Sequence, residues 1–150
     1  MLAVLLLLPA LGCAEGLTVK GMTLGTRWDA LDKSDARTAR CEQVEDNLTR
    51  CDFLDTYWGH ETTFYVFHDP KGIITLITID VPEGIGPQAE FDHVVNQYGQ
   101  PSKRLPGVFF WDAKETTVLL VMKTGHNRDN LIFRWNAPKD NAQVTNHKDT

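Results

Sequence analysis

Residues 62–81 read Thr62-Thr-Phe-Tyr-Val-Phe-His-Asp-Pro-Lys-Gly-Ile-Ile-Thr-Leu-Ile-Thr-Ile-Asp-Val81 and contain two runs of β-branched and aromatic residues around a turn. Residues of these types favour extended strands, and the Asp-Pro-Lys-Gly sequence at 69–72 is typical of a type I turn. Gly72 can adopt the left-handed conformation that lets the second strand begin. The stretch therefore predicts a β-hairpin with strands over 62–67 and 73–81.

The segment after the hairpin predicts a helix. Four apolar residues recur at the spacing of one helical face: Phe91, Val94, Val95 and Tyr98. Gly99 and Pro101 are typical of a helix end. Three further strands are expected around 108–112, 117–123 and 131–135.

The segment before the hairpin predicts a short strand at 17–19 and a first helix over 26–31, in which Thr26 and Asp29 have capping-box spacing. The polar stretch from 34 to 47 is expected to hold the end of this helix and a loop. A further strand is expected near 51–54.

Taken in order, these elements are a helix followed by three strands, twice, over 21–81 and 84–136. The connections are too short for parallel crossovers, so we expect an α+β fold of two tandem αβββ units with an antiparallel sheet. This single domain covers 14–136, and the polar, aperiodic tail over 137–150 is expected to be disordered.

Both faces of the expected sheet carry large apolar residues, because neighbouring residues of a strand point to opposite faces. Helices should cover one face. The other must meet a second sheet of the same chain, a dimer mate, or a protein or lipid ligand. We expect an internal covering, and the alternative is a partner surface to which four residues contribute: Tyr65, Trp111, Arg134 and Trp135.

The first thirteen residues carry no charge and form a leucine-rich run that ends in Gly12 and Cys13. A membrane-spanning helix needs about 20 apolar residues, so this shorter run predicts an export signal over 1–13. Ala10-Leu-Gly-Cys13 resembles a bacterial lipoprotein box, which implies a lipid on Cys13. Simple cleavage before Glu15 is the alternative. The expected location is the periplasm with attachment to the outer membrane, or secretion.

Export leaves two cysteines, Cys41 and Cys51, in a compartment where disulfides persist, so we expect them to pair. A catalytic or metal-binding thiol with His60 as partner is the alternative.

Several function classes are disfavoured by composition and motif context. The net charge of -5, with both signs interspersed, disfavours nucleic acid as a partner. The motif Gly84-Ile-Gly-Pro-Gln-Ala89 matches a dinucleotide fingerprint, but Gly and Pro follow its helix where a parallel strand should stand. Ser34 and Ser102 lack a hydrolase setting. We therefore expect no nucleotide, no cofactor and no enzymatic activity.

Three stretches, Val19-Lys-Gly-Met-Thr23, Phe64-Tyr-Val-Phe67 and Leu76-Ile-Thr-Ile-Asp80, resemble the SmpA/OmlA-type outer-membrane lipoproteins of the β-barrel assembly machinery. Tyr98-Gly-Gln-Pro101 followed by Phe110-Trp111 extends the likeness over most of 19–135. The duplicated αβββ layout also resembles β-lactamase-inhibitor-like proteins. The resemblance implies a non-enzymatic envelope protein that binds other envelope proteins.

The leading hypothesis is an exported, lipid-anchored binding or scaffold protein of the bacterial cell envelope. One alternative is a periplasmic metal-binding protein or small enzyme that uses His60, His68 and nearby carboxylates, with His126 as a further ligand. Another is an inhibitor of a secreted enzyme, with a concave sheet surface or a protruding loop at 125–130.

Overall fold

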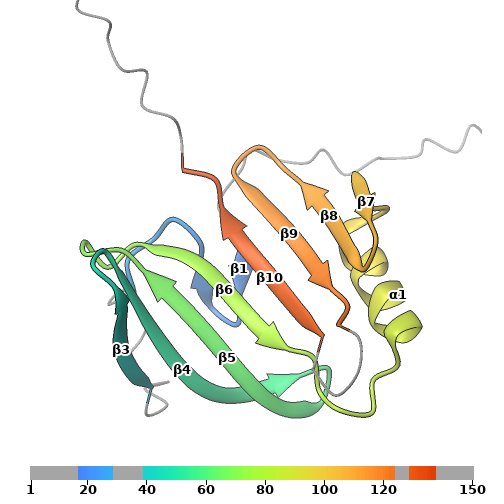
Figure 1. Ribbon diagram of the computed structural model, residues 1–150, viewed down its shortest axis with the longest axis horizontal. Helices are drawn as coiled ribbons and strands as arrows, with labels where there is room; N and C mark the ends of the chain where they lie inside the picture. The colour runs from blue at the N-terminus through green and yellow to red at the C-terminus, as the bar shows by residue number, and fades with distance from the viewer. Residues whose placement is uncertain (1–16, 29–38, 124–128, 138–150) are drawn as a thin grey trace, which may run out of the picture.

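An eight-stranded antiparallel sheet forms the body of the molecule in the computed structural model, which describes residues 17–28, 39–123 and 129–137 (Figure 1). The sheet order is β3-β4-β5-β6-β10-β9-β8-β7, and β1 and β2 form a separate two-stranded sheet. The elements are β1 (Thr18–Val19), β2 (Met22–Thr23), β3 (Arg40–Glu45), β4 (Leu48–Tyr57), β5 (His60–His68), β6 (Ile74–Asp80), α1 (Pro87–Tyr98), β7 (Lys103–Leu105), β8 (Val108–Asp112), β9 (Thr116–Val121) and β10 (Asn130–Trp135).

The sheet consists of two four-stranded meanders that meet in the middle. Strands β3 to β6 run from one edge to the centre, and β7 to β10 run from the other edge to the centre. The last strands of the two meanders, β6 and β10, pair with each other, from Asn130 opposite Asp80 to Arg134 opposite Leu76. Helix α1 connects the end of β6 to the far edge of the sheet.

The predicted α+β fold of two αβββ units is wrong, because the described residues hold one helix and a predominantly β structure. The first helix was expected over 26–31. Its described part instead pairs with the start of β6: Arg27 bridges Ile73, the Gly25 amide donates to Ile74, and the Trp28 amide donates to Gly72. Residues 29–38 lie outside the described ranges.

Besides β2 at Met22–Thr23, two strands of the large sheet were not predicted. The sequence 40–45, expected to be loop, is the edge strand β3, and 103–105 is the opposite edge strand β7. Each is paired with its sequence neighbour, β3 with β4 and β7 with β8. The two meanders therefore have four strands each where three were expected.

The central hairpin, the second helix and the three C-terminal strands are confirmed. Strands β5 and β6 pair through a turn in which Asp69 accepts hydrogen bonds from the amides of Lys71 and Ile73. Helix α1 ends at Gly99, which has a φ of 80° and donates its amide to the Val95 carbonyl. A positive φ costs glycine little, so this residue closes the helix without strain.

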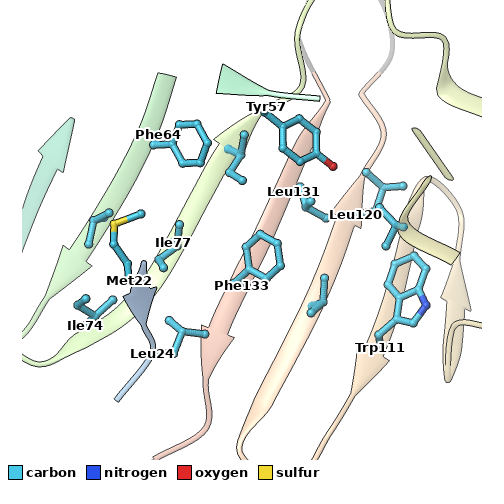
Figure 2. Packing of buried hydrophobic residues seen from close by; sticks show 14 residues of the cluster. Met22, Leu24, Tyr57, Phe64, Ile74, Ile77, Trp111, Leu120, Leu131 and Phe133 are labelled. Atoms are coloured by element: carbon cyan, nitrogen blue, oxygen red, sulfur yellow. The ribbon is translucent and has the colours of Figure 1, made fainter. Parts of the chain in front are cut away.

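One face of the sheet is the core, and α1 and the β1–β2 hairpin cover it. Phe64, Ile79, Leu131 and Leu120 lie in one row across four strands and are at most 1% exposed. Figure 2 shows Met22 and Leu24 packed over the same face, beside Ile74, Ile77 and Phe133. Val94 brings α1 into this cluster.

The expected disulfide is confirmed. Cys41 and Cys51 stand directly opposite each other in β3 and β4, with their Cα atoms 4.0 Å apart, and form the bond. The disulfide therefore ties the exposed edge strand to the rest of the sheet.

The expected export signal over 1–13 and most of the tail expected over 137–150 lie outside the described ranges. Within the described ranges, none of the helical structure is long and apolar enough to span a membrane.

Candidate functional site

On the face of the sheet opposite the core most side chains are half-buried or exposed, and the described groups that lie over it are local: Asn136 and Asp112 bond to the buried Thr117, and Lys103 lies over the Phe110 ring. We call this face the open face. In β10, Leu131 and Phe133 point to the core, whereas Ile132 and Arg134 point to the open face, because a strand alternates sides. Pairing registers extend this assignment to the neighbouring strands.

The centre of the open face is apolar. One row, which we call the central row, runs across β5, β6, β10, β9 and β8. It contains Tyr65, Thr78, Ile132, Leu119 and Phe110. The rows on either side add Phe67, Leu76, Val121 and Val108. All nine side chains are half-buried, and none belongs to the core cluster.

Polar groups frame this apolar centre toward β3 and β4. Arg50 forms ion pairs with Glu42 at 2.6 Å and with Asp52 at 2.9 Å, and its guanidinium lies 5.7 Å from the Tyr65 ring centroid. Tyr65 in turn donates to Asp80, which also accepts from Asn130. These contacts hold the Tyr65 ring in place at one side of the face.

A second row, which we call the charged row, holds two ionic side chains without an ionic partner among the described residues. Arg134 in β10 lies opposite Leu76 and Thr117, and Asp112 in β8 lies on the other side of Thr117. Thr117 and Ser102 donate hydrogen bonds to Asp112, and both ionic side chains belong to exposed residues. The described ion pairs involve neither residue.

The four residues predicted for a partner surface divide between the two faces. Tyr65 and Arg134 lie on the open face. Trp111 lies on the core face, is 6% exposed, and donates its indole N–H to the Gly99 carbonyl at 2.8 Å. Trp135 packs against the core cluster, directly over Gly25. The open face instead contains Ile132, Leu119 and Phe110. The alternation of side chains along these strands would have placed these three residues on one face.

A buried polar cluster lies on the other side of the sheet, where β4 meets α1. Glu90 is fully buried, and its Oε1 accepts a hydrogen bond of 2.9 Å from the Tyr57 hydroxyl. The second carboxyl oxygen, Oε2, has no hydrogen-bond partner among the described residues. Burial raises the pKa of Glu90, against the opposing effect of the Tyr57 hydrogen bond. Burial and the adjacent Glu90 raise the pKa of Tyr57.

Trp58 and His93 close this cluster from outside. Trp58 has a φ of 49° in the β4–β5 turn, and its ring stacks on His93 with centroids 4.5 Å apart. Burial lowers the pKa of His93. Perturbed titratable groups often mark functional sites. Here the Glu90 carboxyl is sealed beneath its neighbours, and its hydrogen bond with Tyr57 joins α1 to β4.

The predicted histidine pair is not brought together. His60 begins β5 and His68 ends it, so at about 3.3 Å per residue they lie roughly 26 Å apart. Metal bonds of about 2 Å cannot bridge that distance. Among the described residues, no three His, Cys, Asp or Glu side chains are grouped to hold a metal ion. His126 and most of the loop 125–130 lie outside the described ranges.

Comparison with known proteins found no matching family model, no matching curated protein and no matching solved structure. The resemblance to outer-membrane lipoproteins of the β-barrel assembly machinery and to β-lactamase-inhibitor-like proteins therefore stays a prediction from short sequence stretches.

Proposed function

We propose that this chain is an exported, non-enzymatic protein-binding protein of the bacterial cell envelope, and that the open face is its contact surface. The observation that carries the proposal is the apolar centre of that face, formed by nine half-buried side chains on five adjacent strands. Contiguous apolar surface of this kind marks interaction sites in soluble proteins.

The breadth of the open face suits a protein partner. Eight strands spaced at about 4.8 Å span roughly 34 Å, which is comparable to a protein–protein contact patch. Small-molecule sites are concave and enclose most of their ligand. The wide face of this eight-stranded sheet is large enough to contact the surface of a second protein.

The charge of Arg134 limits which side chains the partner can place against it. Its charge lies at the border of the apolar centre, beside Leu76 and Ile132. Covering an arginine with apolar groups alone removes its hydration without compensation, which costs several kcal/mol. The partner surface should therefore be apolar where it meets Ile132 and should carry a carboxylate where it meets Arg134.

Export and lipid attachment at Cys13 belong to the same proposal. The uncharged leucine run over 1–13 supports them, and so does the Cys41–Cys51 disulfide, since such bonds persist in exported proteins. Intact-mass measurement of the mature protein from its native envelope tests this part. A diacylglyceryl adduct on Cys13 is the expected result, and a free N-terminus at Glu15 would contradict lipid attachment.

Site-specific photo-crosslinking tests the contact surface. A photoreactive phenylalanine analogue replaces Ile132 on the open face, and in a matched variant it replaces Asp92, which is exposed on α1. Crosslinking is carried out in intact cells, and the adducts are identified by mass spectrometry.

We expect the Ile132 variant to give a defined protein adduct that the Asp92 variant does not give. Absence of an adduct at Ile132, or equal labelling at both positions, would refute the open face as the contact surface. Circular dichroism of both purified variants confirms that the sheet is intact.

A further inference from the structure

The proposed contact surface is complementary to itself. Resting on the proposed function, we infer that the partner of the open face is a second copy of this chain, packed face to face about a two-fold axis that runs along β9.

A two-fold axis between two facing sheets, parallel to β9, has a simple effect on the rows. It places β9 opposite itself and β10 of one copy opposite β8 of the other, because β10 and β8 flank β9. Each residue then faces, across the interface, the residue of the other copy that lies in the same row on the opposite side of β9. Packed sheets keep their strand directions within about 30° of each other, so this arrangement is a normal sheet-on-sheet packing.

The charged row becomes paired under this axis. Arg134 and Asp112 lie on either side of Thr117, so Arg134 of each copy meets Asp112 of the other. Neither residue takes part in a described ion pair. Facing sheets lie about 10 Å apart, a gap that an arginine and an aspartate side chain span together. Two symmetry-related ion pairs result, as an isologous contact requires.

The central row becomes an apolar contact under the same axis. Ile132 and Phe110 lie on either side of Leu119, so Ile132 of each copy meets Phe110 of the other. Leu119 lies on the axis and meets its own counterpart. The central row therefore brings apolar groups together at Leu119 and Ile132, and the Lys103 ammonium, 5.6 Å from the Phe110 ring centroid, lies at the border of this contact.

Axes along the neighbouring strands lack this complementarity. An axis along β10 places Arg134 against Arg134, and one along β8 places Asp112 against Asp112. An axis along β6 places Asp80 against Asp80. Like charges directly opposite each other are unfavourable, so among β6, β10, β9 and β8 the charge pattern favours an axis along β9.

The footprint of this contact predicts a weak dimer. It covers the five strands from β6 to β7. At about 4.8 Å per strand and five residues of about 3.4 Å along each, it measures roughly 24 by 17 Å, or about 400 Å² of flat area. Standard interfaces bury about 800 Å² per partner. The dimer should therefore form in a concentration-dependent manner.

Charge reversal tests the axis. Sedimentation velocity on the full-length chain, from roughly 1 to 200 μM, measures the monomer–dimer equilibrium. We expect Arg134→Asp and Asp112→Arg each to weaken dimerisation at least about tenfold, and the combined variant to restore it. Arg40→Asp, a reversal on exposed β3 outside the footprint, should leave the equilibrium unchanged.

A second pair of variants tests whether Leu119 lies on the two-fold axis. These variants leave the hydrogen bonds of Asp112 unchanged. Leu119→Glu and Leu119→Lys should each be monomeric, because residue 119 meets its own charge. An equimolar mixture of the two should form a heterodimer. Thermal melting confirms that every variant is folded.

A parent chain that stays monomeric over the whole concentration series would overturn the inference. So would single reversals that leave the dimer intact, or mixed Leu119 variants that do not associate. If the parent is monomeric while Ile132 crosslinks to a different protein, the proposed function stands and the self-association falls. If Ile132 crosslinks to no protein, the proposed function itself falls.

Discussion

Replacement of Gly25 by alanine probes how the N-terminal segment is fixed to the sheet. Gly25 has a φ of +80°, and a Cβ added there would lie 2.9 Å from Cε2 and Nε1 of Trp135. The backbone cannot move away freely, because the Gly25 amide donates to the Ile74 carbonyl at 2.9 Å. The substitution therefore combines a strained backbone with a steric clash.

The expected loss of stability has two parts, a backbone cost and a steric cost. The left-handed backbone costs an alanine about 1–2 kcal/mol, and overpacking against Trp135 costs about 1–3 kcal/mol. Gly25→Ala should therefore lower the free energy of unfolding by about 2–5 kcal/mol. Gly21→Ala is the matched control, since Gly21 has a φ of +79° and nothing lies within 4 Å of an added Cβ. It should cost only the first part.

Urea unfolding followed by tryptophan fluorescence measures both variants, and Trp135→Leu provides the double-mutant cycle. Gly25→Ala should cost less in the Trp135→Leu background than in the parent, because the clashing ring is gone. Equal losses for Gly21→Ala and Gly25→Ala, or strictly additive effects of Gly25→Ala and Trp135→Leu, would refute the steric argument.

Three further predictions concern the buried cluster and the disulfide. The pKa of Glu90 is raised on folding, so the folded state binds more protons, and stability should fall as the pH rises from about 4.5 through the raised pKa. Glu90→Gln should flatten this dependence in urea titrations at pH 5 and pH 8; an unchanged slope would contradict the assignment. Tyr57→Phe removes the donor to Glu90 and should cost about 1–3 kcal/mol at pH 7 by the same assay, whereas a neutral effect would mean that the bond adds nothing. Reduction of the Cys41–Cys51 bond, which joins residues 10 apart, should cost about 3 kcal/mol, and Cys41→Ser should be insensitive to reductant.

The parts of the fold that could be predicted are those with a strong local pattern. The hairpin at 62–81 has β-branched runs around a turn, and α1 has helical periodicity with a glycine end. Strand β3 could not be recognised, because all six of its residues are exposed and it therefore lacks the alternation of a half-buried strand. Its place is determined by pairing with β4 and by the disulfide, which are non-local.

The described start of the expected first helix, residues 26–28, pairs with the segment before β6 for a related reason, and 29–31 lie outside the described ranges. The spacing of Thr26 and Asp29 is a local signal for a helix start, but the Trp28 amide, which a cap at Thr26 would engage, donates to the Gly72 carbonyl. Pairing with a segment 46 residues away, where Arg27 bridges Ile73, overrides a weak capping preference.

The candidate site was predictable in part. Tyr65 and Arg134 were expected on a partner surface and lie on the open face. Arg134 and Trp135 are adjacent in β10, so strand alternation alone places them on opposite faces. The burial of Glu90 was not predictable, because it depends on Tyr57 reaching α1 from a distant strand.

The seam between β6 and β10 also determines how the chain must fold. Each meander can grow by adding a neighbouring strand through a short turn, at small loop-closure cost. The seam is different, since Asp80 and Asn130, which pair across it, are 50 residues apart in sequence. Long-range pairing of this kind slows folding. Closure of the seam is therefore expected to limit the folding rate, and until it closes both half-sheets leave an unpaired strand at what becomes the centre of the molecule.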